Sequence, residues 1–162
     1  MLLRIANNCS SDTTIKTRGG FTMPNIDRAI MIASIAHSGQ KDKAGKPYIL
    51  HPLRVMFSVE TEEQKIVAVL HDVIEDTYIQ AQHLREHGFS EDIINALESV
   101  TKKEGESRMD AAKRTKLNII GTVVKLADLK DNMDLSRIAI PTEKDLLRIA
   151  KYEEVKNFLE SN

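Results

Sequence analysis

Residues 61–77 read TEEQKIVAVLHDVIEDT, and this stretch carries both a clear fold signal and a group of chemically active side chains. Thr61 and Gln64 form a capping-box pattern, which marks the N-terminus of a helix. The apolar residues that follow recur at helical spacing and would face a core. They are Ile66, Val67, Leu70, Val73 and Ile74. We therefore expect one helix from Thr61 to about Asp76.

Helical patterns continue on both sides of this stretch. Upstream, a polar loop occupies residues 41–46, and Pro52 suits the first turn of a helix that begins near His51. Val123 and Val124 are β-branched, so a strand is the alternative there, although no partner strand is evident. The pattern predicts an all-α, single-domain helical bundle. Further helices of this bundle are expected before Gly39, up to Gly88, after Ser90, over 108–116, over 119–133 and after Thr142. The apolar face of the last helix would consist of Leu146, Ile149, Ala150, Val155, Phe158 and Leu159.

The composition narrows the class of protein. The chain has 162 residues, of which 41% are hydrophobic, so it can bury the core of one domain. A net charge of −1 gives no global attraction to nucleic acid or to an anionic membrane, and no apolar run reaches the length of a membrane span. Cys9 is the only cysteine, which agrees with a reducing cytoplasm. We expect residues 1–22 to form a flexible tail and residues 23–162 to form the domain.

Two imidazoles and two carboxylates suggest a site for one divalent metal. His71 and Asp72 are adjacent, and His51 and Asp128 could join them if the fold brings their segments together. A mixture of nitrogen and oxygen ligands suits Mn²⁺, Fe²⁺ or Zn²⁺ better than Ca²⁺. A bound ion of this kind promotes hydrolysis because it acidifies water and neutralises phosphate charge.

Glu75 and Asp76 follow the His-Asp pair by one helical turn. Carboxylates at this position could orient an attacking water or protonate a leaving oxygen. The alternative is a solvated acidic helix end. Lys41 and Lys43 also have two interpretations: they belong either to a solvated turn or to a basic rim that attracts phosphate. We interpret His37 as a packed histidine and not as a metal ligand.

Four blocks of sequence resemble the HD superfamily of metal-dependent phosphohydrolases, and in particular the hydrolase domain of the RelA/SpoT family with its small stand-alone relatives. The blocks are AHSGQ at 36–40, GKPYILHP at 45–52, LHDVIEDT at 70–77, and VKLAD at 124–128 with Asn132-Met133. Their order and rough spacing agree with the family, and four ordered blocks are far more specific than one His-Asp pair.

The resemblance implies an all-helical fold and a role for each matching residue. It makes His51, His71, Asp72 and Asp128 the ligands of a metal, usually Mn²⁺. The family reaction removes pyrophosphate from the ribose 3′ position of guanosine tetraphosphate or pentaphosphate. Glu75 and Asp76 would be the catalytic carboxylates, and the substrate contacts would come from Lys41, Lys43, Asn132 and Arg137.

The chain departs from the family where the nucleotide is recognised. Asp42 occupies the place of an arginine that packs on guanine, Leu129 that of another arginine, and Asp131 that of a histidine. Asp131 would either repel an anionic substrate or hold a basic neighbour. The segment between Asp72 and Asp128 is also shorter than in the family.

These observations predict a cytoplasmic, metal-dependent hydrolase acting on a small nucleotide, with no nucleic-acid or membrane partner. The oligomeric state cannot be read from the sequence. Two alternatives stay open: a phosphomonoesterase acting on another nucleotide, and a non-catalytic module that senses a nucleotide. Because a sensor need not keep Glu75, Asp76 and all four ligands, the hydrolase is the preferred interpretation.

Overall fold

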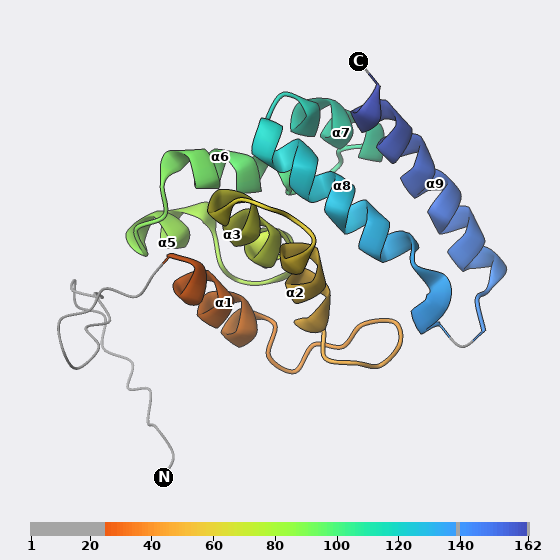
Figure 1. The fold of residues 1–162 in the computed structure, drawn as a ribbon, viewed down its shortest axis with the longest axis horizontal. Helices are drawn as coiled ribbons and strands as arrows, with labels where there is room; N and C mark the ends of the chain where they lie inside the picture. Colours follow the sequence, from red (N-terminus) through yellow and green to blue (C-terminus); the bar gives the residue numbers. More distant parts are fainter. Residues whose placement is uncertain (1–24, 139, 162) are drawn as a thin grey trace, which may run out of the picture.

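Helices make up the regular structure of the chain in the computed structural model, which describes residues 25–138 and 140–161 (Figure 1). The predicted tail at residues 1–22 and the side chain of Arg137 lie outside this description. The described residues contain no strand, so the all-α prediction is confirmed. None of their helices is both long and apolar enough to cross a bilayer. The helices are α1 Asn25–Ala36, α2 Leu50–Phe57, α3 Glu62–Leu70, α4 Val73–Asp76, α5 Ala81–Glu86, α6 Glu91–Val100, α7 Arg108–Lys116, α8 Ile119–Met133, the 3-10 helix η1 Leu135–Arg137, and α9 Glu143–Glu160.

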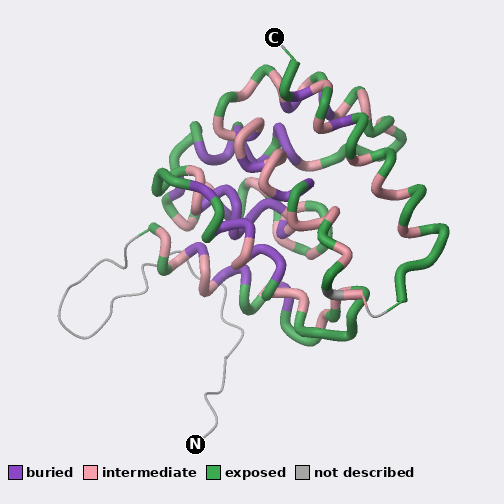
Figure 2. Tube along the Cα trace, turned by 45° about the vertical axis from the view of Figure 1, so that its right-hand side comes forward, coloured by how far each residue is buried: buried purple, intermediate pink, exposed green. Residues whose placement is uncertain are grey.

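Helix α3 lies at the centre and packs against α1, α2, α6 and α8 (Figure 1). Its start confirms the predicted capping box, since the Thr61 side chain accepts from the Gln64 N–H and the Gln64 side chain accepts from the Thr61 N–H. The residues from Ile66 to Leu70 are all buried, and Figure 2 shows the buried chain concentrated around this helix. The main core therefore surrounds the element that leads into His71.

The predicted continuous helix from Thr61 to Asp76 is wrong in one respect. Helix α3 ends at Leu70, and His71 and Asp72 form a turn before the single-turn helix α4. The Asp72 backbone has φ −94° and ψ −6°, away from ideal helical values. This turn releases the two side chains from the fixed divergence of neighbouring residues on a regular helix, so both can point at one place.

Helix α8 runs unbroken for 15 residues, which excludes the strand alternative at Val123 and Val124. It lies beside α6, α3 and α2. Its residue Asp128 lies next to His71 in the turn after α3. Close packing against α6 depends on Gly121, because a Cβ atom there would lie 2.1 Å from Ser99 Oγ.

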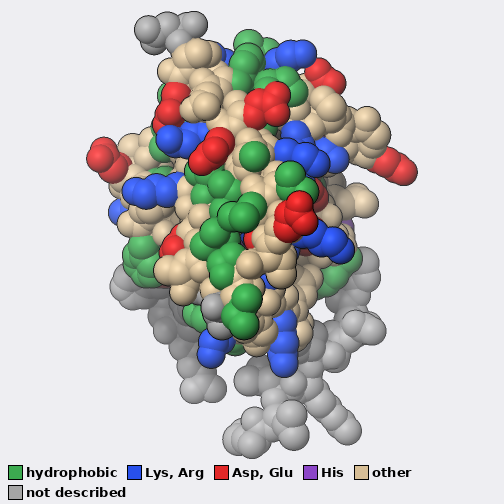
Figure 3. Space-filling model, turned by 90° about the vertical axis from the view of Figure 1, so that its right-hand side faces the viewer, with side chains coloured by type: hydrophobic (Ala, Val, Ile, Leu, Met, Phe, Trp, Pro, Cys, Tyr) green, Lys and Arg blue, Asp and Glu red, His purple; other side chains and the backbone are tan. Residues whose placement is uncertain are grey.

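Helices α7, α8 and α9 enclose a second, smaller core that includes Leu129, Val155 and Leu159. Only the C-terminal half of α9 contributes to it. The expected apolar face is therefore wrong for the first half of the helix, where Leu146 is 56% exposed and Ala150 is also exposed. Figure 3 views the molecule from the α9 side and shows apolar side chains at the surface between charged ones. Arg148 in the first half of α9 lines one of the cavities described below, and Tyr152 in the second half lines both.

Candidate metal centre

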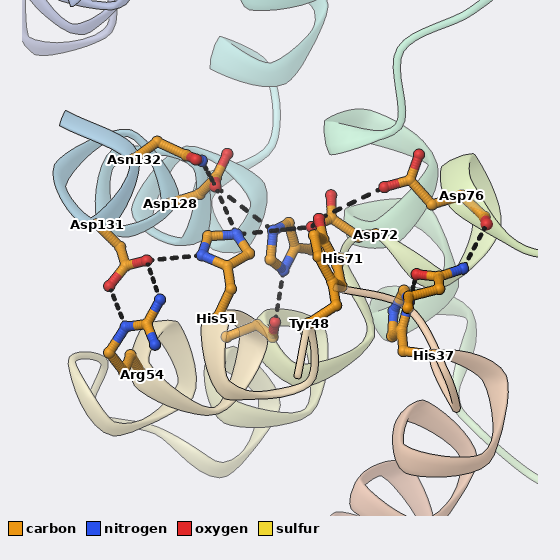
Figure 4. Close-up of polar contacts among 12 residues, drawn as sticks. His37, Tyr48, His51, Arg54, His71, Asp72, Asp76, Asp128, Asp131 and Asn132 are labelled. Carbon is orange, nitrogen blue, oxygen red and sulfur yellow. Dashed lines mark hydrogen bonds and ion pairs between the residues drawn. The ribbon is translucent and has the colours of Figure 1, made fainter. Parts of the chain in front are cut away.

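Four side chains from three helical segments meet in a ring (Figure 4). His51 Nε2 lies 3.2 Å from Asp128 Oδ1 and 3.6 Å from Asp72 Oδ2. His71 Nε2 lies 3.0 Å from Asp72 Oδ2 and 3.5 Å from Asp128 Oδ1. Nitrogen and oxygen atoms thus alternate around a small space, with the four predicted metal ligands at its corners.

Three of these side chains, those of His51, His71 and Asp128, are buried. His51 is the second residue of α2 and is buried, with Pro52 in the first turn as expected. The ring of His71 is held by a 2.7 Å hydrogen bond between Nδ1 and the carbonyl oxygen of Ala68, one turn earlier. Asp128 is 4% exposed within α8, where side chains rather than water surround its carboxylate.

The ring fits a divalent cation. Ligand atoms of His51, His71 and Asp128 all lie within 4.8 Å of one another, and Asp72 adds an oxygen beside both imidazoles. Neighbouring ligands at about 2.1 Å from one ion would be about 3 Å apart, close to the observed spacing. The buried Nε2 of His71 makes no well-directed hydrogen bond in the described part of the chain, although Asp72 Oδ2 lies 3.0 Å away, so a cation between the two atoms would satisfy it.

Without a cation, protons balance the charges of the ring. Burial opposes a charge on His71, but Asp72 and Asp128 outweigh it and raise the pKa of His71 well above its ordinary value. Burial also opposes the charge on Asp128, yet Lys125 and the two imidazoles keep the pKa of Asp128 well below its ordinary value. The pKa of Asp72 falls to about 2 because His71 outweighs the effect of burial. The carboxylates of Asp72 and Asp128 are therefore ionised, and positive charge beside them stabilises them.

The predicted catalytic carboxylates, Glu75 and Asp76, make different contacts near Asp72. Glu75 is exposed, lines a cavity next to the ring, and accepts a 2.9 Å hydrogen bond from the Lys102 backbone N–H. Asp76 lies beside Tyr48, and burial together with the charges of Asp72 and Glu75 raises the pKa of Asp76. Both carboxylates are exposed, and Glu75 is the one that lines the cavity next to the ring.

Two cavities of about 330 Å³ each flank the ring and share Tyr48, Asn132 and Tyr152 in their walls. The first, here called the α7 cavity, contains the cations Lys102, Arg108 and Lys125 together with Asp72, Glu75 and Asp128. The second, here called the loop cavity, is lined by Lys41, Asp42, Lys43, His51, Ile138 and Arg148 among others.

The predicted substrate contacts reach these cavities to different extents. Asn132 lines both cavities and donates a hydrogen bond to Asp128 Oδ1. Lys41 and Lys43 line the loop cavity, where burial and the charge of Arg148 lower the pKa of Lys43. The predicted contact of Arg137 concerns a side chain outside the described part of the chain.

The structure accounts for the three departures from the family pattern. Asp42 Oδ1 accepts hydrogen bonds from the Ala44 and Lys46 N–H groups, so it shapes the loop and offers no flat surface to a base. Leu129 is buried in the second core. Asp131 holds a basic neighbour, one of the two options that the sequence left open, because it pairs with Arg54 over 2.7 Å.

Sequence reasoning missed three polar side chains at the ring. Tyr48 donates to Asp72 Oδ2, Lys125 lies 2.8 Å from Asp128 Oδ2, and Arg54 pairs with Asp131. Tyr48 and Lys125 stand within the matching sequence blocks, and Lys125 precedes Asp128 by one helical turn, so spacing alone could have suggested Lys125. His37 is buried against the Tyr48 ring, as expected for a packed histidine.

Known proteins resemble this chain in sequence and in fold, although no model of a protein family matches it. A guanosine-3′,5′-bis(diphosphate) 3′-pyrophosphohydrolase of Borreliella burgdorferi is 32% identical over 92% of this chain and 24% of its own length. The enzyme of the same name in Aquifex aeolicus is 33% identical over 67% of this chain and 17% of its own length. A GTP pyrophosphokinase of Streptomyces coelicolor is 34% identical over 84% of this chain and 17% of its own length.

The chain thus spans at most 24% of the length of these three relatives. A solved structure of similar fold is a metazoan orthologue of SpoT that hydrolyses ppGpp; it has a TM-score of 0.70 and 21% identity, covering 87% of this chain and 88% of the other. By its sequence relatives and by its fold, the chain belongs to the HD-type hydrolase domains of the RelA/SpoT family.

Proposed function

We propose that this domain hydrolyses the 3′-pyrophosphate of guanosine tetraphosphate and pentaphosphate, releasing pyrophosphate. The observation that carries the proposal is the position of the four-residue ring between two cavities, one of which gathers Lys102, Arg108 and Lys125. Relatives that match most of this chain are named for this reaction, and the similar solved structure is described as hydrolysing ppGpp.

The proposed cofactor is Mn²⁺, with Fe²⁺ and Zn²⁺ as alternatives, held by His51, His71, Asp72 and Asp128. Two nitrogen and two oxygen donors suit these ions, and four protein ligands leave room for water or substrate. When bound, the ion would supply an acidified water and neutralise charge on the phosphate.

The chain's own residues would do the remaining work. Glu75 faces the α7 cavity and would orient the water that attacks the ribose-proximal 3′ phosphorus. The cations of the same cavity would neutralise the departing pyrophosphate. The loop cavity, with Lys41, Lys43 and Arg148, would receive the nucleoside and its 5′ phosphates, and Asn132 would contact the substrate between the two cavities.

The partner in this proposal is a small nucleotide, and the proposed location is the cytoplasm. Base selection is the least constrained step, because Asp42 is bound within its loop and Leu129 is buried. These two positions favour, as a second candidate, hydrolysis of a phosphomonoester on another nucleotide.

The test is incubation of the purified protein with guanosine tetraphosphate and Mn²⁺, followed by anion-exchange separation of the products. The proposal expects guanosine diphosphate and pyrophosphate, abolished by EDTA and by Asp72→Ala. Orthophosphate released from a panel of nucleotides would support the phosphomonoesterase instead. Nucleotide binding without turnover in the presence of bound Mn²⁺ would indicate a sensor.

A further inference from the structure

His51 makes a polar contact through each of its ring nitrogens. Nε2 faces Asp72 and Asp128, whereas Nδ1 lies 2.7 Å from Asp131 Oδ2 on the opposite side (Figure 4). The contact is well enclosed, since the side chains of His51 and Asp131 are only 7% and 13% exposed. A carboxylate accepts but cannot donate, so the hydrogen of this bond belongs to Nδ1.

Arg54 forms two hydrogen bonds with the carboxylate of Asp131. Its Nε lies 2.7 Å from Asp131 Oδ1 and its Nη2 lies 3.0 Å from Oδ2, the fork geometry in which guanidinium and carboxylate planes are locked together. Arg54 follows His51 by three residues on α2, so both side chains project from one face of that helix towards Asp131 on α8. The carboxylate therefore cannot turn away from the imidazole without breaking two charged hydrogen bonds.

The two ring histidines are thus oriented by different means. His71 uses the carbonyl oxygen of Ala68, which belongs to α3, the helix directly before it. His51 uses a side chain on another helix, and that side chain depends in turn on Arg54. An imidazole with hydrogen on Nδ1 keeps the Nε2 lone pair free for a cation.

We propose that Asp131, held by Arg54, is a positioning residue that fixes the ring of His51 so that Nε2 is presented to the metal. The proposal rests on the metal centre of the proposed function, and it concerns metal binding rather than the substrate. Partners that orient a ligating histidine commonly contribute 10–100-fold to metal affinity.

The first experiment measures the Mn²⁺ affinity of the full chain, with the concentration of free Mn²⁺ determined by electron paramagnetic resonance. Asp131→Ala should weaken binding about 10–100-fold. Asp131→Asn should fall between this variant and the wild type, because the amide oxygen still accepts the Nδ1 hydrogen but lacks charge. Circular dichroism of the metal-free variants verifies that each is folded.

Arg54 is tested by a double-mutant cycle with a matched control. Arg54→Ala should weaken Mn²⁺ binding less than Asp131→Ala, and the double variant should bind no worse than Asp131→Ala alone, because Arg54 acts only through Asp131. Arg85→Ala is the control: Arg85 is 34% exposed against 35% for Arg54, and it also makes a two-bond contact with a carboxylate, that of Glu91. Its removal should leave Mn²⁺ affinity unchanged.

A second readout distinguishes orientation from general loss of structure. In Zn²⁺-loaded protein, nuclear magnetic resonance should show the His51 Nδ1–H proton protected from exchange, and Asp131→Ala should abolish that protection. Wild-type Mn²⁺ affinity in Asp131→Ala, or a His51 proton that stays protected, would overturn the proposal. If the metal results hold while guanosine tetraphosphate stays intact, the proposed hydrolysis fails and this inference stands.

Discussion

Tyr48 donates its phenolic hydrogen to Asp72 Oδ2 over 2.5 Å, and the same hydroxyl lies 3.4 Å from Asp76 Oδ2. Burial, followed by the charge of Asp72, raises the pKa of Tyr48, so the phenol keeps its hydrogen across the physiological range. The neutral hydroxyl of Tyr48, which precedes α2, thereby holds the carboxylate of Asp72 in the turn between α3 and α4.

Replacing Tyr48 by Phe should raise the pKa of Asp72 in the metal-free protein from its value of about 2. The shift should be about one unit, the size of one lost hydrogen bond to a charged group, while the ring contacts of Tyr48 persist. Carboxyl carbon chemical shifts followed through an acid titration would measure it. Tyr78→Phe removes an exposed hydroxyl and serves as the control. An unchanged pKa of Asp72 would show that the short contact contributes nothing.

Substitutions of Asp72 and of Glu75 should have different effects on metal binding and on turnover. Asp72→Ala removes a proposed ligand, so Mn²⁺ binding and hydrolysis should be lost together. Glu75→Gln keeps the size of the side chain and the ring intact, so Mn²⁺ should bind normally while kcat falls about 10²–10⁴-fold. Calorimetric titration with Mn²⁺ and product analysis on the same preparations test both. Full activity in Asp72→Ala would refute the ligand assignment.

The metal-free protein should lose stability as pH rises above neutrality. Burial opposes charge on His51, but its hydrogen bonds to Asp128 and Asp131 raise the pKa of His51, and the pKa of His71 is raised further. A raised folded-state pKa adds stability that is complete below the ordinary histidine pKa of 6.5 and disappears as pH passes the folded-state pKa. Asp72 and Asp128 have lowered pKa values, so their contribution changes only in acid.

Urea unfolding between about pH 6 and about pH 8.5, with EDTA or with Mn²⁺, measures this effect. With EDTA the free energy of unfolding should decline with pH. With Mn²⁺ the decline should vanish, because the cation replaces the protons as the partner of the two carboxylates. A metal-free protein whose stability rises over this range would contradict the expected charge balance of the ring.

Gly121→Ala should destabilise the packing of α8 on α6. In an exposed helix this change would stabilise by about 1 kcal/mol, but here the new Cβ would lie 2.1 Å from Ser99 Oγ, and overpacking costs about 1–3 kcal/mol. Thermal unfolding should show a lower Tm for Gly121→Ala. The double variant with Ser99→Ala should recover it, because the remaining Ser99 Cβ lies 3.4 Å away. Absence of recovery would mean that another contact limits the approach.

Much of the fold was predictable from the sequence because its signals are local. The capping box at Thr61, the N-caps Ser90 and Thr142, Pro52 in a first turn and Gly88 after a helix are all present as expected. Each depends on residues within one or two turns. The helix break at His71 and Asp72 was not predicted, because the helical spacing of apolar residues continues through it. The turn is stabilised only by contacts with other segments of the chain.

The sequence by itself determined the helical class, the helix starts and the identity of the four candidate ligands, because periodicity, capping and ordered motifs act over short range or are matched residue by residue. Only the tertiary structure decided that Glu75 lines a cavity while Asp76 lies beside Tyr48, and that Asp131 contacts both His51 and Arg54. Those outcomes depend on how α2, α3 and α8 pack, which places residues 80 positions apart within a hydrogen bond of each other.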